Sequence, residues 1–187
     1  MKMIEIEIKA KITNPKLTFE KIKNIGGEYS HTEIQRDIYF NGENRDFKKT
    51  DEALRIREIP DGDDFINILT FKGPKLDSET KTRKEIEVTI DSKEHMTDIL
   101  INLGYKPSAI VNKVRRIFKY EEYTITVDKL NELGYFIEIE YVASDEDNIE
   151  PIQKNIFEIF AKLGITEGFE KTSYLELLEK NKTNNIN

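Results

Sequence analysis

Hydrophobic and polar residues alternate along several short segments of the chain, beginning with EIEIKAKI at residues 5–12. Alternation with a period of two is typical of a β-strand with one apolar face and one polar face. Related segments occur later, as EIEVTI at 85–90 and EIEYVAS at 138–144. Because the same charged pattern occurs three times, we interpret it as a feature of the fold rather than chance.

Each of these segments is followed by a helix-like stretch and then by another strand-like run. Apolar spacing and a glycine just beyond the last turn predict helices at about 16–25, 93–103 and 151–163. The strand-like runs that follow them cover 34–40, 111–118 and 171–178, and further strands are predicted at 53–58, 66–73 and 123–130. We therefore expect a single α+β domain of mainly antiparallel strands over residues 1–178, with 179–187 as a disordered polar tail.

Composition excludes several classes of protein. The chain has 187 residues, which fits one compact domain, and its net charge of −7 argues against general nucleic-acid binding. It contains no cysteine, and its two histidines are far apart, so a thiolate or histidine metal site is not expected. No apolar run approaches the ~20 residues of a membrane span. We expect a cytoplasmic protein that binds neither membrane nor nucleic acid.

The charged residues of the predicted strands fall on one face of each strand. In the first strand, Glu5, Glu7 and Lys9 oppose isoleucines, and in ALRIRE, Arg55 and Arg57 oppose Leu54 and Ile56. By the same alternation, the other strands place on their polar faces Lys72, Arg83, Glu85, Glu87, Lys113, Arg115, Asp128, Glu138 and Glu140. Two architectures fit: a sheet that shows these charges to solvent, or a barrel that encloses them. Acids paired on three strands and bases paired on two others favour the barrel.

An enclosed set of such charges has a definite chemistry. Carboxylates two residues apart on one strand face are separated by about 6–7 Å, which suits one shared cation or two neighbouring cations. Oxygen ligands alone favour Mg²⁺ or Mn²⁺. Arginines and lysines that converge on the same space require an anion, and the guanidinium fork suits phosphate oxygens. The pattern therefore predicts a site for a metal-bound polyphosphate.

The same residues resemble the motifs of a known family. EIEIKAK matches the ExExK signature of the CYTH superfamily, also called triphosphate tunnel metalloenzymes. LRIRE, TFKGPK, KTRKEIE, NKVRR, TVDKLNELGYFIEIE and KTSYLELL resemble, in order, further motifs of its class IV adenylate cyclase, or CyaB-like, branch. The resemblance covers about residues 1–178.

The resemblance implies an eight-stranded antiparallel β-barrel, a tunnel with helices packed on its outside. Its metal positions, for two Mg²⁺ or Mn²⁺ ions, would be Glu5, Glu7, Asp128, Glu138 and Glu140. Its triphosphate-binding positions would be Lys9, Arg55, Arg57, Lys72, Arg83, Lys113 and Arg115, with Lys9, Arg55 and Arg57 assigned to catalysis. Glu85 and Glu87 match acidic tunnel positions. Tyr174 is expected in a strand that closes the barrel.

Three functions follow from the resemblance and remain open at the level of sequence. The first is a class IV-type adenylate cyclase that converts ATP to cyclic AMP and pyrophosphate. The second is a triphosphatase acting on inorganic triphosphate, thiamine triphosphate or a nucleoside triphosphate, and the third is a polyphosphate-binding or nucleotide-binding module without catalysis. Members of this branch tend to form homodimers, so a homodimer is a further expectation.

Overall fold

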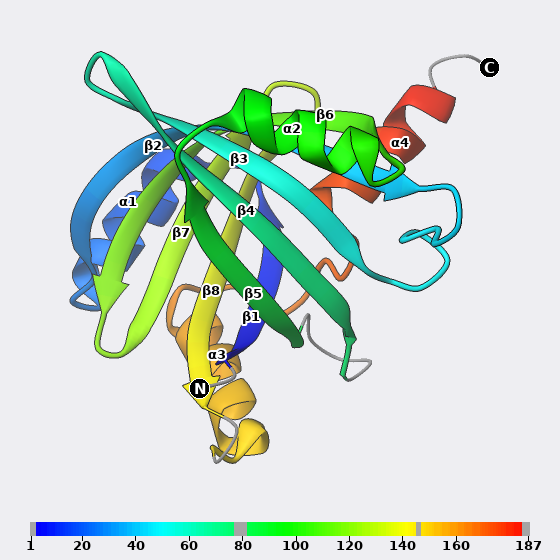
Figure 1. Cartoon of the computed structure of the whole chain (residues 1–187). Coiled ribbons are helices and arrows are strands. Elements are labelled where there is room, and N and C mark those ends of the chain that lie inside the picture. Colours follow the sequence, from blue (N-terminus) through cyan, green and yellow to red (C-terminus); the bar gives the residue numbers. More distant parts are fainter. Residues whose placement is uncertain (1–2, 77–81, 145–146, 185–187) are drawn as a thin grey trace.

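Residues 3–76, 82–144 and 147–184, described by a computed structural model, form a barrel with helices on its outside (Figure 1). The strands are β1 (Met3–Ile12), β2 (Glu28–Gly42), β3 (Ala53–Asp61), β4 (Asp64–Lys75), β5 (Arg83–Ile90), β6 (Tyr105–Tyr120), β7 (Tyr123–Leu130) and β8 (Gly134–Ser144). The helices are α1 (Pro15–Asn24), α2 (Lys93–Asn102), α3 (Ile149–Lys162) and α4 (Tyr174–Asn184).

The strands close in the order β1-β5-β4-β3-β2-β6-β7-β8, and every neighbouring pair is antiparallel. The expected eight-stranded antiparallel barrel is thus confirmed. Closure is uneven around β1, which pairs with β8 through ten residue pairs but with β5 through only three. Beyond this short seam, Ile86 and Val88 on the outer face of β5 are about half exposed.

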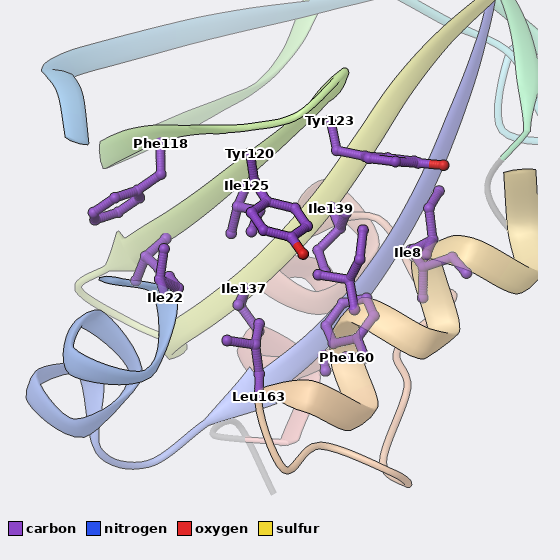
Figure 2. Close-up of a cluster of buried hydrophobic side chains, with 14 of the residues drawn as sticks. Ile8, Ile22, Phe118, Tyr120, Tyr123, Ile125, Ile137, Ile139, Phe160 and Leu163 are labelled. Atoms are coloured by element: carbon purple, nitrogen blue, oxygen red, sulfur yellow. The ribbon is translucent and has the colours of Figure 1, made fainter. Parts of the chain in front are cut away.

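The largest apolar cluster lies between the outer face of the barrel and helices α1 and α3 (Figure 2). Ile8 of β1 and Ile139 of β8 are opposite each other in register, and both are buried in the same cluster as Phe160 of α3. Burying an isoleucine or phenylalanine side chain contributes about 1.5–3 kcal/mol. Because the apolar side chains of these strands pack outward on the helices, the alternating charged side chains must point inward.

A second cluster packs α2 against β2, β3 and β4. Leu100 of α2 is buried with Phe40, Leu54 and Ile56. The glycines expected to end the second and third helices are Gly104 and Gly164, and both have the left-handed backbone (φ +90° and +73°) that glycine adopts easily. No helix in the described ranges is both long and apolar enough to cross a membrane.

The strand expected at residues 171–178 is wrong, because this segment turns into helix α4 at Tyr174. A capping box begins the helix: the Ser173 amide donates to Glu176 Oε2 (2.8 Å), and the Glu176 amide donates to Ser173 Oγ (3.2 Å). Tyr174 packs with Val111, Leu130 and Phe136 at one end of the barrel interior. Residues 179–184 continue this helix, and 185–187 of the expected tail lie outside the described residues.

Candidate active site in the barrel interior

The barrel encloses a cavity of about 350 Å³ whose walls carry most of the charged residues predicted from strand parity. Acidic residues come from the adjacent strands β8, β1 and β5, and basic residues come mainly from β3, β4 and β6. The predicted residues that line the cavity are Glu5, Glu7, Arg55, Arg57, Lys72, Arg83, Glu85, Glu87, Lys113, Arg115, Glu138 and Glu140. Lys9 and Asp128 are buried behind this lining.

Three of the carboxylates converge on one point. Glu7 and Glu140 are opposite each other on β1 and β8, and Glu5 lies two residues before Glu7 on the same face. One carboxylate oxygen from each lies within 4.8 Å of the others. Burial, reinforced by the charges of Glu5, Glu138 and Glu7, raises the pKa of Glu140 to about 8, although Arg115 opposes this. The three carboxylates fit a hard divalent cation, whose charge would relieve their repulsion.

The other two predicted metal ligands, Asp128 and Glu138, contact Arg115 instead. Arg115 Nε donates to Asp128 Oδ1 (2.8 Å), its Nη2 donates to Asp128 Oδ2 (2.7 Å) and to Glu138, and its Nη1 donates to Glu140 Oε1 (3.1 Å). Lys113 Nζ also donates to Asp128 Oδ2 (3.2 Å). Burial and the neighbouring Arg115 lower the pKa of Lys113 to about 8. This part of the site is a dense ion-pair network.

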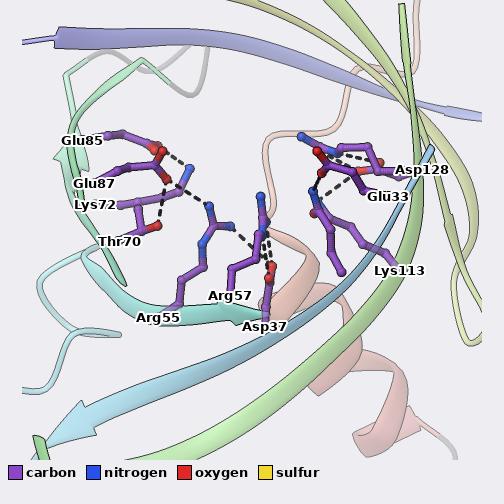
Figure 3. Close-up of polar contacts among 12 residues, drawn as sticks. Glu33, Asp37, Arg55, Arg57, Thr70, Lys72, Glu85, Glu87, Lys113 and Asp128 are labelled. Carbon is purple, nitrogen blue, oxygen red and sulfur yellow. Dashed lines mark hydrogen bonds and ion pairs between the residues drawn. The ribbon is translucent and has the colours of Figure 1, made fainter. Parts of the chain in front are cut away.

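The pair Arg55 and Arg57 on β3 has a different partner, Asp37 of β2 (Figure 3). Arg57 Nε and Nη2 donate to the two oxygens of Asp37 at 2.7 and 2.8 Å, and Arg55 Nη1 lies 3.4 Å from Oδ2. Burial would raise the pKa of Asp37, but the positive charges of Arg57 and Arg55 hold it well below its usual range. Asp37 is only 1% exposed, yet the two arginines keep it ionised inside the barrel.

Lys72 of β4 connects the acids of β1 and β5. Its Nζ donates to Glu5 Oε2 (3.1 Å) and to Glu85, while Thr70 donates to Glu87 Oε1 (2.8 Å). Burial and the nearby Glu5 raise the pKa of Glu85 to about 8, whereas Lys72 overcomes the burial of Glu5 and holds the pKa of Glu5 low. The pKa values of the two carboxyls are thus shifted in opposite directions around one lysine.

Two predicted phosphate ligands lie at the edges of the site. Arg83 Nη2 is 3.6 Å from Asp51 Oδ1, which also accepts from Lys75 Nζ at 2.7 Å. Lys9 is 1% exposed, and its Nζ donates to the Thr172 carbonyl (2.7 Å) at 3.9 Å from the centre of the Tyr174 ring. Lys9 therefore holds the segment before α4 against the barrel in this structure.

Asp37 is a site residue that the pattern of paired charges did not identify. It stands alone in QRDIYF, without the paired acids or bases that marked the other strands. Its role becomes visible only from the strand order, which places β2 between β3 and β6. The available signal was its parity, since Asp37 alternates with the apolar-face residues Ile38 and Phe40.

The fold and the site together define a closed β-tunnel with an acidic wall facing a basic wall. Residues 3–174 match the CYTH domain model, so the chain belongs to the CYTH family. This confirms the expected family and the broad class, a triphosphate tunnel enzyme.

Several relatives are similar over most of the chain. A Methanocaldococcus jannaschii protein named "putative adenylate cyclase" is 43% identical over 94% of this chain and 98% of its own length. The CyaB adenylate cyclase of Aeromonas hydrophila is 27% identical over 81% of this chain and 75% of its own length. The PH1819 protein from Pyrococcus horikoshii has a structure with a TM-score of 0.86 and 41% identity, covering 94% of this chain and 98% of that one.

Proposed function

We propose that this protein is a divalent-cation-dependent enzyme of the class IV adenylate cyclase type, which converts ATP to cyclic AMP and pyrophosphate. The observation that carries the proposal is the placement of the Glu5–Glu7–Glu140 carboxylates in the same cavity as the Arg55–Arg57 pair. Such a cavity suits a polyphosphate whose charge is met by a cation on one side and by guanidinium groups on the other. The names of the M. jannaschii and A. hydrophila relatives favour the cyclase reaction.

In this reaction the ribose 3′ hydroxyl loses its proton to water and its oxygen forms a bond to the α-phosphorus. The bond from that phosphorus to the pyrophosphate oxygen breaks, and pyrophosphate leaves with the electron pair. A bound Mg²⁺ or Mn²⁺ would supply charge neutralisation at the phosphate oxygens. Glu5, Glu7 and Glu140 would hold that ion, and Arg55 and Arg57 would orient the phosphate chain by donating to its oxygens. Lys72, already between Glu5 and Glu85, would add positive charge on the same side as the ion.

The test is an assay with Mg²⁺ or Mn²⁺ and, separately, ATP, thiamine triphosphate and inorganic triphosphate. We expect cyclic AMP from ATP, and we expect Glu7→Gln to lower the rate by more than about 100-fold, since it removes one anionic ligand from the group of three. Addition of EDTA should abolish the reaction. Formation of orthophosphate without cyclic AMP would indicate a triphosphatase rather than a cyclase. Turnover of none of the three compounds would favour a binding module.

A matched control distinguishes loss of a metal ligand from a general loss of folding. Glu94→Gln removes a carboxylate from the surface of α2, outside the cavity lining, and should leave the rate unchanged. Circular dichroism should show both variants folded. Full activity of Glu7→Gln would contradict the assignment of the metal position.

A further inference from the structure

Asp37 occupies the middle of the basic side of the tunnel. Strand β2 lies between β3, which carries Arg55 and Arg57, and β6, which carries Lys113 and Arg115. In register, Asp37 is directly opposite Arg57. A buried carboxylate at this position has two possible duties: to neutralise nearby cations, or to orient them toward something else.

The hydrogen bonds of the two buried arginines separate these duties. A guanidinium group has five N–H donors. Arg115 gives four hydrogen bonds to Asp128, Glu138 and Glu140. Arg57 gives two, both to Asp37, and its guanidinium makes no other hydrogen bond within the described ranges. Asp37 therefore fixes the orientation of Arg57 from behind and leaves most of its donors available at the cavity.

Arg55 has donors available in the same place. The Arg55 side chain is 9% exposed, and its contacts are long: Nη1 is 3.4 Å from Asp37 and Nη2 is 3.6 Å from Glu87. Its Nε is buried and has no hydrogen-bond partner among the described residues. A buried N–H without a partner is costly, and an oxygen-rich anion would satisfy it.

Asp37 is also separate from the candidate metal site. In the described residues, the carboxylates close enough to share an ion are Glu5, Glu7 and Glu140. Asp37 directs both of its oxygens to guanidinium groups, which leaves it poorly suited to bind a cation.

We propose that Asp37 is a positioning residue that holds Arg55 and Arg57 as a preformed receptor for the phosphate groups of the substrate. The inference rests on the proposed function, because it assigns the anion-binding part of the same tunnel. It distinguishes the two basic pairs: Arg55 and Arg57 receive the anion, whereas Arg115 mainly connects Asp128 with Glu138 and Glu140.

The experiment measures binding of inorganic triphosphate by calorimetry in EDTA, with the full-length protein and without turnover. Asp37→Asn keeps the size of the side chain but turns an acceptor into a donor that opposes the Arg57 fork. We expect binding to weaken by at least about ten-fold. Asp98→Asn, on the exposed surface of α2, removes the same charge outside the site and should leave binding unchanged.

Two further measurements exclude a purely structural role. Mn²⁺ binding without triphosphate, followed by electron paramagnetic resonance, should change less than about two-fold in Asp37→Asn, because Asp37 is not a ligand of the ion. In a double-mutant cycle, Asp37→Asn and Arg57→Lys should be strongly non-additive, because both remove the same two hydrogen bonds. Asp37→Glu, which restores the charge, should recover part of the triphosphate affinity.

The outcomes are distinguishable. If the wild-type protein binds no triphosphate, the proposed function fails and this inference fails with it. If the wild type binds and folded Asp37→Asn binds equally well, only the inference is overturned. Loss of Mn²⁺ binding in Asp37→Asn, or additive losses in the cycle, would also overturn it. Should Asp37→Asn fail to fold, Arg57→Lys alone must weaken triphosphate binding by at least about ten-fold.

Discussion

The two basic pairs of the tunnel have similar sequence spacing but different surroundings. Arg55 and Arg57 on β3 share one buried carboxylate, Asp37, whereas Arg115 on β6 meets three. The number of acids around a buried arginine decides how many of its donors remain for a ligand. Equal spacing of bases in the sequence therefore does not mean equal function in the folded barrel.

The difference between the two basic pairs is tested most directly by removing one arginine from each pair. Arg115→Ala leaves Asp128, Glu138 and Glu140 without their shared partner, and we expect it to lower the free energy of unfolding by about 3–5 kcal/mol. Arg57→Ala should cost less stability, because Arg55 still faces Asp37, but should weaken triphosphate binding more. Urea unfolding and calorimetry measure the two effects.

A control for this pair of variants is Arg36→Ala, on the outer face of β2 next to Asp37. Its side chain is 43% exposed and its Nη1 is 3.9 Å from Glu58 Oε1, so its removal should change stability by less than about 1 kcal/mol. Equal destabilisation by Arg57→Ala and Arg115→Ala would show that the two pairs do the same work.

The acidic wall and the basic wall should affect the pH dependence of stability in opposite directions. The pKa values of Glu85 and Glu140 are raised from 4.5 to about 8, so the folded protein binds more protons than the unfolded chain between these pH values. Stability in EDTA should therefore fall as pH rises from 5 to 8, with a drop in melting temperature of at least about 3 °C.

Above pH 8, the titration of Lys113 on the basic wall should make stability increase with pH instead of decrease. The pKa of Lys113 is lowered from 10.5 to about 8, so the unfolded chain binds more protons in this range and stability should rise again. We expect a minimum near pH 8 in thermal melts without metal. Glu140→Gln should flatten the acidic side of the curve, and a flat wild-type curve would contradict the unequal protonation of the two walls.

The smallest effect is expected where oppositely charged groups meet in solvent. Lys48 donates to Glu179 Oε2 at 2.6 Å and links the segment before β3 to α4, but its side chain is 70% exposed. Water screens such a pair, so Lys48→Ala should shift the melting temperature by less than about 2 °C. A larger shift would mean that the ion pair holds α4 in place. Lys49→Ala, whose side chain is 84% exposed, is the matched comparison.

Much of this architecture could be predicted from sequence, because alternation in a strand fixes which side chains share a face. That rule placed Glu5, Arg55, Lys113 and Glu140 inside before any strand order was known. It could not predict which strands become neighbours, and this order is what brings Asp37 to Arg57 and turns Arg115 toward Asp128. Which enclosed charged residues form ion pairs depends on the register between neighbouring strands, and alternation within one strand does not determine that register.

The wrong prediction of a strand at residues 171–178 has a local cause. The run SYLELL contains apolar residues compatible with either a strand or a helix, and short runs of this kind are ambiguous. The Ser173–Glu176 capping box decides for the helix, and its spacing was visible in the sequence. The contact between Lys9 and Thr172 depends on where this helix docks, so the interpretation of Lys9 could not be reached from its motif alone.

The pairing of β1 almost entirely with β8 has a consequence for synthesis of the protein. The first strand emerges from the ribosome long before its main partner, which ends at Ser144. At about 5–20 residues per second, the delay is on the order of ten seconds. During that time β1 is an unpaired strand able to join other chains, and its row of charges opposes such association. The residues that serve the finished tunnel thus also protect the nascent chain.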